Sequence, residues 1–532
     1  MALLRALSVA VAFCSIASGF AVPNVVDLTL DDIQRGLQEG CFSSEALVEA
    51  YTGRIGEVNG MVQAVTEVNP DAIKIAKQLD QERAENKIRG PLHGVPILLK
   101  NNLATKDAMN NTAGSHALIG ATVPRDSTVV NKLRDAGAII LGKANLSQWS
   151  FYRSFDLPSG WSSHGGQVHG AYHDNQDPNG SSSGSGSATD LGLAAACIGT
   201  ETWGSLLGPS HRNNIVGIKP TVGLTSRDLL IPVSEHLDTV GPMARTVKDA
   251  AYVLQAIAGQ DTNDNYTSAI PAIPDYVAAC KNESLNVKIG VPWKLLAQVP
   301  PSSSAELNAF NESVRVLQEA GATIVDTDFT FPGNMDDFIT MLSSDFMTNI
   351  AGYFAKLATN PNNITDLRQL REYTKTTPVE QFPQFSVSLW DNVIDNIGFP
   401  NTDPRFWTMF QSLTAMEKTQ GLQFALESQQ LNAVVLPTSI GPQFLAPSGG
   451  PGVTVPMGFY PESAPITNSP GDLVDTGPAI PFGLSFLGPR WSEEQLIKMA
   501  YVYEQRTQAR GQGKRKVNPN TEVKVAAVCQ KS

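Results

Sequence analysis

The sequence predicts an α/β protein with a large mixed, mostly parallel sheet that is covered by helices on both faces. Short apolar runs alternate with amphipathic segments, the pattern of strands that are separated by crossover helices. Strand-like runs occur near both ends of the chain, so one interleaved domain explains the order of elements better than a string of domains. The 532 residues are 42% hydrophobic, which is enough for a sizeable core.

The N-terminus has the pattern of a secretory signal peptide over residues 1–21. Arg5 precedes an apolar run over residues 6–16, and small residues follow at Ala17, Gly19 and Ala21. We therefore expect a secreted, extracellular protein without a membrane segment after cleavage. Six sequons fit export, namely Asn110, Asn145, Asn265, Asn282, Asn311 and Asn363. A seventh, at Asn179, adjoins a serine cluster and is expected to stay unglycosylated.

The first half of the predicted domain, which spans residues 22–510, alternates helices and strands. Residues 28–57 have helical spacing and a plausible cap at Thr29, and residues 71–85 form a second, solvated helix. A Gly-Pro turn then leads into a buried strand that ends at Lys100 and carries this lysine toward the interior. Further elements are a helix over 129–136, a strand over 139–142, a strand over 216–222 and a helix over 246–258.

The second half contains the segments expected to shape a substrate pocket. Residues 152–179 form a long loop without periodicity, and residues 285–430 read as a helical elaboration. Strand-like runs return over 433–436 and 481–487, followed by a closing helix over 493–510. Residues 511–532 read as a short polar tail, in which Lys514, Arg515 and Lys516 are solvated.

Charge and cysteine content limit the possible functions. A net charge of -12 argues against a nucleic-acid partner, because phosphate binding needs clustered Lys and Arg. Cys14 leaves with the signal peptide, and Cys197 reads as a small core residue. A disulfide among Cys41, Cys280 and Cys529 is possible, but the spacing does not identify the pair. No cysteine pair has metal-ligand spacing.

The residues between Gly180 and Ser205 are the strongest candidate for a site. Glycines beside serines let backbone N–H groups approach a ligand that develops negative charge. The apolar residues 188–198 that follow read as a buried helix, which a flexible linker does not explain.

Two other motifs are weaker candidates, one for a nucleophile and one for a metal site. Gly180, Ser182 and Gly184 match a nucleophile elbow, but the preceding DNQDPNG is no apolar strand and no histidine follows His236. The histidines His164, His169 and His173, with Asp174, have spacing that could suit a metal, but the glycines between them oppose a helix.

Two carboxylates and one thiol are further candidates for catalytic groups, and the sequence favours a structural role for each. Asp190 and Glu201 flank the predicted helix and are expected to orient loop backbone rather than to act as an acid pair. Cys197 is poorly placed for a thiol nucleophile.

Lys100, Ser181 and Ser205 stand in motifs that resemble the amidase signature family, whose members hydrolyse amides with a Ser-Ser-Lys triad. The motifs are GVPILLK over 94–100, GSSSGSG over 180–186, GTETWGS over 199–205 and GIKPT over 217–221. The two serines are 24 positions apart, as in the family, which selects Ser181 from three adjacent serines. SGWSSHGGQ at residue 159 and the TVGLTSR continuation are most similar to the peptide-amidase branch.

The resemblance implies a role for each residue. Ser205 is the nucleophile, Lys100 the base, and Ser181, on a cis peptide bond in relatives, carries the proton between them. Backbone N–H groups of Thr202, Trp203, Gly204 and Ser205 form the oxyanion hole, and Ser182 supports the loop. The family needs no cofactor and no metal. A lysine base must be neutral, so its pKa must fall from about 10.4 toward 7, which costs roughly 4 kcal/mol and which burial can impose.

The sequence departs from the family at three places near this chemistry. Asn101 replaces the usual Asp, Trp203 replaces Gly or Asp, and Leu207 replaces a frequent Arg. An inactive relative that binds amides therefore stays possible, as does a subunit of an amidotransferase. We expect an active amidase acting on a small-molecule or peptide amide. The physiological substrate and the oligomeric state are left open by the sequence.

Overall fold

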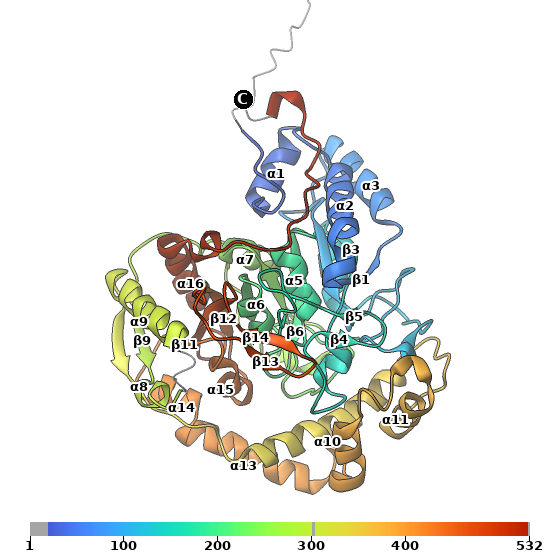
Figure 1. Cartoon of the computed structure of the whole chain (residues 1–532), viewed down its shortest axis with the longest axis vertical. Helices are drawn as coiled ribbons and strands as arrows, with labels where there is room; N and C mark the ends of the chain where they lie inside the picture. The colour runs from blue at the N-terminus through green and yellow to red at the C-terminus, as the bar shows by residue number, and fades with distance from the viewer. Residues whose placement is uncertain (1–19, 300–303, 530–532) are drawn as a thin grey trace, which may run out of the picture.

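The computed structural model describes residues 20–299 and 304–529, and a sheet of eleven strands runs through this part of the chain (Figure 1). The strand order is β1-β3-β2-β6-β8-β7-β12-β15-β11-β9-β10. Its strands are β1 (Val65–Val68), β2 (Pro96–Lys100), β3 (Ile139–Ala144), β6 (Ala196–Glu201), β7 (Val216–Lys219), β8 (Thr239–Ala244), β9 (Lys288–Val291), β10 (Thr323–Asp326), β11 (Ala433–Pro437), β12 (Gly452–Phe459) and β15 (Pro481–Leu487). Every residue of β2, β3, β6, β7, β8, β11 and β15 is buried, so both faces of the sheet are covered.

The predicted mixed sheet is confirmed, although parallel pairs are not in the majority. β2 pairs in parallel with β3 and β6, and β9 with β10 and β11, whereas the other six pairings of this described sheet are antiparallel. β7 and β8, for example, are joined by residues 220–238, which contain no helix, and they pair as antiparallel neighbours.

The N-terminal segment predicted to be helical contains two helices, α1 (Leu30–Gln38) and α2 (Ser44–Val62), and α3 (Ala72–Ala84) follows. Thr29 caps α1 as predicted: its hydroxyl oxygen accepts from the Asp32 N–H, and the Asp32 carboxylate accepts from the Thr29 N–H, each at 3.1 Å. Residues 1–19 of the predicted signal peptide lie outside the described residues.

The helix predicted over residues 188–198 is wrong. The helix α5 (Ser183–Asp190) covers the serine-rich residues instead, and the small apolar residues form β6 in the middle of the sheet. Small side chains let α5 lie close to the strands: Ser185 Oγ donates to the Ile198 carbonyl at 3.1 Å, and a Cβ at Gly184 would collide with backbone oxygens of Ala64 and Asn145. A short apolar run suits a fully buried strand as well as a helix, and Ala196, Cys197 and Ile198 at the end of this run begin β6.

The remaining helices pack around this sheet and include α4 and α7, which match the predicted segments. They are α4 (Thr128–Asp135), α6 (Leu207–Arg212), α7 (Val247–Ile257), α15 (Gly441–Ser448) and the closing α16 (Glu493–Thr507). The long loop of residues 152–179 contains a short hairpin of β4 (Trp161–Ser162) and β5 (Gly166–Gln167). A second hairpin, later in the chain, consists of β13 (Thr467–Ser469) and β14 (Leu473–Thr476). No helix among the described residues is long and apolar enough to cross a membrane.

The segment over residues 285–430 is mostly helical, as predicted, but it begins with β9 and β10, which extend the main sheet. Its helices are α8 (Trp293–Leu296), α9 (Ser304–Glu319), α10 (Met335–Phe354), α11 (Leu367–Thr376), α12 (Ser388–Asp391), α13 (Pro404–Gln420) and α14 (Leu422–Ser428). Figure 1 shows α10, α11 and α13 as an arch along one end of the molecule. They enclose a second apolar core that includes Trp149, Phe338, Phe346 and Trp390.

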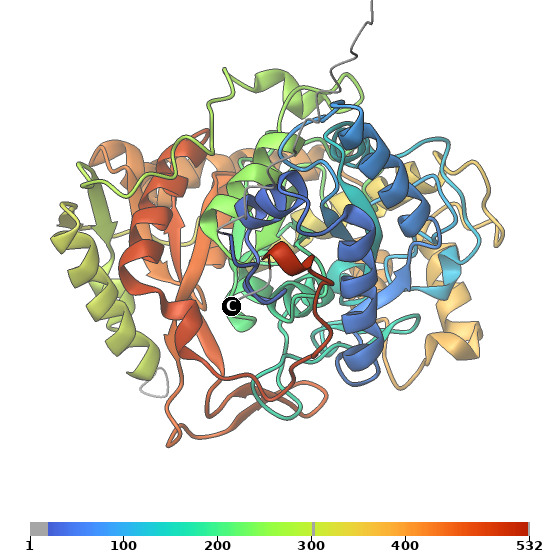
Figure 2. The same ribbon diagram turned by 90° about the horizontal axis from the view of Figure 1, so that it is seen from above.

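The C-terminal residues are not a free tail. They run from α16 back toward α1 and α2 (Figures 1 and 2), where Cys529 forms a disulfide with Cys41. Lys514 and Lys516 are exposed, as predicted, but Arg515 forms an ion pair with the buried Asp190 at 2.8 Å. The local charge pattern does not show this pair, because Asp190 lies 325 positions earlier in the chain.

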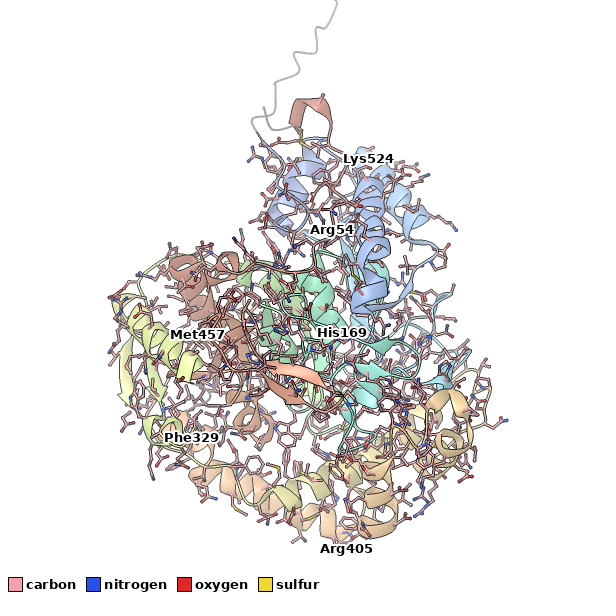
Figure 3. All side chains as sticks on the ribbon, in the orientation of Figure 1. Arg54, His169, Phe329, Arg405, Met457 and Lys524 are labelled. Carbon is pink, nitrogen blue, oxygen red and sulfur yellow. A yellow bond between two sulfur atoms is a disulfide. The ribbon has the colours of Figure 1, made fainter. Side chains whose placement is uncertain are left out.

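Arg54 joins this segment to the centre of the molecule (Figure 3). Its guanidinium, which is nearly fully buried, donates to the carbonyls of Leu191 and Gly192 after α5 and to that of Thr521 in the C-terminal segment. The C-terminal residues therefore brace the end of α5, whose other end begins two residues after Ser181.

Candidate active site

Three chain segments meet at one edge of the sheet because β2 and β6 are parallel neighbours. Their carboxyl ends lie at the same edge, so Lys100 at the end of β2 comes close to the turn that follows Glu201. The third segment is the Gly180–Ser181 peptide, which is cis, immediately before α5. This convergence places Lys100, Ser181 and Ser205 in one region.

Lys100 is completely buried and contacts Ser181 directly. Its Nζ lies 2.7 Å from Ser181 Oγ and 3.3 Å from the Thr200 carbonyl oxygen. Burial lowers the pKa of Lys100 to about 7, and the negative charges of Asp238 and Glu201 offset only part of this effect. At neutral pH a substantial fraction of the amine is therefore uncharged and can accept a proton from the serine hydroxyl.

Ser182 ties the serine loop both to β6 and to the turn that carries Ser205. Its hydroxyl donates to the Thr200 carbonyl at 3.0 Å and accepts from the Thr200 N–H at 3.2 Å. Its own N–H donates to the Ser205 carbonyl at 3.0 Å. Ser181 has no exposed surface, whereas Ser205 is 8% exposed, so Ser205 is the serine of the pair that solvent can reach.

Glu201 shapes the turn around Ser205. One of its carboxylate oxygens accepts from the N–H groups of Leu206 and Leu207, at 2.8 and 2.9 Å, at the start of α6. Within the part of the chain that the structure describes, the N–H groups of Trp203, Gly204 and Ser205 donate to no protein acceptor. The turn thus leaves three consecutive N–H groups, ending at Ser205 itself, without a protein acceptor.

Thr202 is held by Asp238, a residue that the sequence analysis did not identify. The Thr202 hydroxyl donates to one carboxylate oxygen of Asp238, and the other accepts from the N–H groups of Val233 and Ser234, at 2.9 and 3.1 Å. Burial raises the pKa of Asp238 to about 6, although these hydrogen bonds act in the opposite direction. The segment DTVGPMAR begins at Asp238, but nothing in the sequence shows which residue this carboxylate holds.

The three departures from the family pattern occupy distinct places. Asn101 is buried, and its side chain donates to Thr66 and accepts from the Thr112 N–H, each at 3.1 Å, so it anchors loops. Leu207 is fully buried in the main core. Trp203 packs edge to face on Phe338 of α10, with ring centroids 5.3 Å apart.

The remaining candidates make structural contacts. His164 contacts Thr112, and His173 contacts the Asp174 carbonyl. The one grouping with metal-ligand geometry in residues 20–299 and 304–529 is Glu235, His236 and Asp345, not the predicted histidines. Asp190 binds Arg510 and Arg515, and Glu201 binds backbone N–H groups, so both carboxylates orient structure as expected.

Two further residues at the site were missed by the sequence analysis. The Thr200 carbonyl accepts from both Lys100 and Ser182, and the Asn102 side chain donates to the Thr200 hydroxyl at 3.0 Å. A backbone carbonyl has no signature in a sequence, so the part played by Thr200 could be found only in the structure.

Comparisons with known proteins agree with the motifs. The family model described as Amidase matches residues 46–497. A protein of Arthroderma benhamiae named as a candidate amidase is 48% identical, over 94% of this chain and 89% of its own length. The peptide amidase of Stenotrophomonas maltophilia is 35% identical with a TM-score of 0.82, covering 93% of this chain and 99% of its own. An amidase family protein of Bacillus anthracis is 30% identical with a TM-score of 0.80, covering 92% and 93%.

Proposed function

The chain belongs to the amidase family and hydrolyses a carboxylic or peptide amide, and on this premise we propose which residues perform each step. Ser205 attacks the amide carbonyl, while its hydroxyl proton passes to Ser181 and the Ser181 proton passes to the neutral amine of Lys100. The observation that carries this assignment is the 2.7 Å contact between Lys100 Nζ and Ser181 Oγ inside a fully buried environment.

The remaining steps return the enzyme to its starting state. The tetrahedral oxyanion accepts hydrogen bonds from the backbone N–H groups of Trp203, Gly204 and Ser205, which have no protein acceptor among the described residues. The C–N bond breaks as the proton returns from Lys100 through Ser181 to the leaving nitrogen, and an ester on Ser205 remains. Water then attacks this ester with Lys100 again as base, which releases the carboxylic acid and restores the Ser205 hydroxyl.

A fluorophosphonate probe followed by mass spectrometry tests the assignment of the nucleophile. We expect the label on Ser205 in folded protein, and none in the Ser205→Ala variant. Ser182→Ala is the matched control, because that serine is also buried and bonds to the turn that carries Ser205 but is assigned only a supporting role. Labelling of Ser181 or Ser182 instead of Ser205 would contradict the assignment.

We propose that the substrate is an amide of the kind a peptide amidase accepts. The similarity to the Stenotrophomonas peptide amidase over nearly the full length of both chains supports this class. Hydrolysis of aliphatic amides, aryl amides and C-terminally amidated peptides, with the Ser205→Ala variant as control, tests it. A clear preference for the amidated peptides is expected, whereas hydrolysis of aliphatic amides alone would refute it.

We further propose that the protein is exported and glycosylated. The disulfide between Cys41 and Cys529 supports an oxidising compartment. The side chains of Asn265, Asn282, Asn311 and Asn363 are exposed, whereas Asn145 is fully buried. Asn179 is half-buried and accepts from the Gly180 N–H.

The glycosylation proposal is tested by peptide mapping of the secreted protein before and after enzymatic removal of N-glycans. We expect glycans at some of the four exposed sites and none at Asn145 or Asn179. Retention of the full-length protein inside the cell, with residues 1–21 intact, would contradict export.

A further inference from the structure

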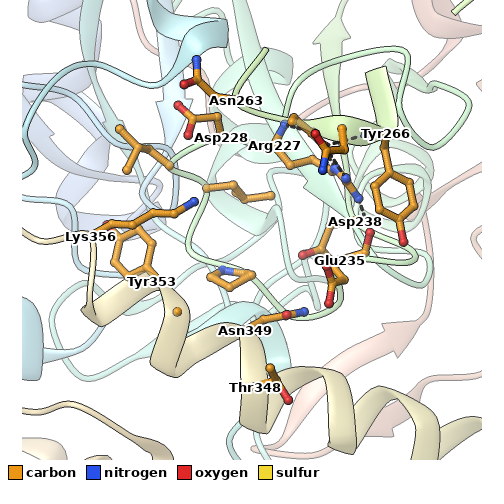
Figure 4. Close-up of a pocket in the computed structure, with 16 residues that line it drawn as sticks. Arg227, Asp228, Glu235, Asp238, Asn263, Tyr266, Thr348, Asn349, Tyr353 and Lys356 are labelled. Atoms are coloured by element: carbon orange, nitrogen blue, oxygen red, sulfur yellow. Dashed lines mark hydrogen bonds and ion pairs between the residues drawn. The ribbon is translucent and has the colours of Figure 1, made fainter. Parts of the chain in front are cut away.

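Asp238 is a buried carboxylate that contacts the turn before Ser205 although it is not one of the three residues assigned to proton transfer and attack. It ends the loop of residues 227–238, immediately before β8, and borders a cavity that α10 also lines (Figure 4). The residue is only 3% exposed. Burial of a carboxylate is costly unless hydrogen bonds stabilise it, so its partners decide where it lies.

The two oxygens of Asp238 have different partners. One accepts from the N–H groups of Val233 and Ser234, at 2.9 and 3.1 Å, within its own loop. The other accepts from the hydroxyl of Thr202 in the turn. The loop backbone therefore orients the carboxylate, and the carboxylate in turn fixes the Thr202 side chain.

The loop that carries Asp238 is itself attached to α10. The Ser234 hydroxyl donates to the Asp345 carboxylate at 2.5 Å, and the same carboxylate accepts from the Asn401 side chain at 2.9 Å. Ser234 and Asp345 have no exposed surface. Hydrogen bonds to carboxylates are stronger than those between neutral groups, so these contacts give Asp238 a firm support outside the turn.

The turn of the nucleophile is attached to carboxylates at both of its ends. Asp238 holds Thr202 at the start, and Glu201 accepts from two N–H groups at the start of α6, at 2.8 and 2.9 Å. Between these attachments, the N–H groups of residues 203–205 have no protein acceptor in the described part of the chain. Their direction depends on the two ends, and an error of about 1 Å in such a group can cost roughly 100-fold in rate.

We propose that Asp238 is a positioning residue for amide hydrolysis: by holding the Thr202 hydroxyl, it directs the N–H groups of residues 203–205 to the place where the oxyanion forms. The inference rests on the proposed role of Ser205 as the nucleophile. Asp238 itself touches neither the substrate nor the reacting atoms. Because charge on the carbonyl oxygen develops in the transition state, loss of this support lowers kcat and changes KM little.

Substitutions of Thr202 test the contact from the side of the turn. Thr202→Val removes the hydroxyl and keeps the shape of the side chain, so kcat should fall about 10- to 100-fold while KM stays within about twofold. Thr202→Ser keeps the hydroxyl and should recover most of the lost kcat. A folded Thr202→Val variant with the kcat of the parent, or with a raised KM alone, would overturn the proposal.

Thr267→Val is the matched control for the loss of a buried hydroxyl. Thr267 is 1% exposed, and its hydroxyl donates to the Asp264 carbonyl at 2.8 Å. This variant should keep kcat within about twofold of the parent, because the hydroxyl supports a different turn. Thermal unfolding checks that every variant is folded.

A double-mutant cycle tests whether Asp238 acts through Thr202. Asp238→Ala should lower kcat at least as much as Thr202→Val, and the double variant should have about the kcat of Asp238→Ala alone, since both changes remove one bond. Losses that multiply would show that the carboxylate acts by another route and would overturn the proposal. If Asp238→Ala does not fold, the Thr202 variants decide the question by themselves.

The fluorophosphonate probe separates this proposal from the assignment of the nucleophile. Label on Ser205 of the parent, together with an undiminished kcat in Thr202→Val, overturns only the positioning role. An unlabelled Ser205 in the folded parent overturns the nucleophile itself.

Discussion

Three buried lysines show why burial alone does not identify a base. Lys100, Lys143 and Lys219 have no exposed surface, and burial lowers their pKa values to about 7, 7 and 8. Lys143 donates to the Leu103 carbonyl and to Asn111, and Lys219 donates to two backbone carbonyls. Only Lys100 of the three contacts a hydroxyl group, and that contact distinguishes the assigned base from two lysines that bind backbone carbonyls and an amide.

Substitution of Lys100 is expected to remove most of the activity. Lys100→Ala should lower kcat by about 10³-fold or more, since general-base catalysis contributes at about that level. Lys100→Arg should not restore activity, because arginine stays charged. Lys143→Met is the matched control, with similar burial and no contact with the serines. Steady-state kinetics on folded protein measures all three, and rescue by arginine would refute the assignment.

The pH dependence of activity follows from the same lysine. The reactive amine is the deprotonated form, which predominates above the folded pKa of about 7. We therefore expect kcat/KM to rise about tenfold per pH unit below that value and to level off above it. A pH profile at constant ionic strength measures this, and a rate that is flat or falling from pH 5.5 to 8 would contradict it.

At the scale of elements, α10 connects the nucleophile turn to the helical arch. Trp203 lies edge to face on Phe338, which lies edge to face on Phe331 at 5.4 Å. The indole that replaces the family's small residue therefore has a packing partner on α10. Asn349 and Tyr353 of the same helix line a cavity of about 450 Å³, so α10 borders both the nucleophile turn and this cavity.

A double-mutant cycle measures the contact between the turn and α10. Trp203→Ala and Phe338→Ala should each lower the free energy of unfolding, with a coupling of about 1 kcal/mol between them. Denaturant unfolding of the four proteins gives the coupling. Trp203→Ala should also change KM more than kcat, because it alters the wall of the site and leaves the reacting groups in place. Additive effects would show that the ring contact is absent in solution.

The end of α5 depends on one buried carboxylate and two arginines. Although burial opposes it, the pKa of Asp190 is lowered because Arg515 and Arg510 favour its charged form. Asp190→Asn should reduce the free energy of unfolding by about 3–5 kcal/mol, since both guanidinium groups lose their counter-charge. The carboxylate contributes its stability above its unfolded pKa, and the contribution disappears as pH falls through the lower folded pKa. Urea unfolding at pH 7 measures the loss, which should shrink in strongly acidic solution.

At the scale of the whole molecule, the two ends of the chain are joined. Cys41 and Cys529 are 488 positions apart, and the segment before Cys529 passes Asp190 and Arg54 on its way to α1. The closure links the N-terminal helices to the segment that braces α5.

Opening this closure should destabilise the entire molecule. Reduction, or Cys41→Ser with Cys529→Ser, should lower the free energy of unfolding by about 2–4 kcal/mol. Thermal unfolding with and without a reductant measures the effect. The double variant is the control and should not respond to reductant, because Cys197 and Cys280 are unpaired. Equal midpoints for reduced and oxidised parent protein would contradict this expectation.

The motifs allowed the family and the residues of the candidate triad to be predicted, because Lys100, Ser181 and Ser205 each lie in a short motif of neighbouring residues. They did not allow the end of α5 to be predicted. Small apolar residues suit either a helix or a buried strand, and only packing against β2 and β8 made residues 196–201 a strand.

By itself, the sequence determined the alternating α/β pattern and the amidase motifs, since these depend on local spacing, and the family's separation of 24 residues predicted Ser181 among three serines. The tertiary structure decided that Asp238 holds Thr202, that Arg515 pairs with Asp190, that Cys41 bonds to Cys529, and that α10 lines a cavity. Each of these contacts joins side chains from separate segments. Such contacts depend on the path of the whole chain, which local patterns of residue type do not encode.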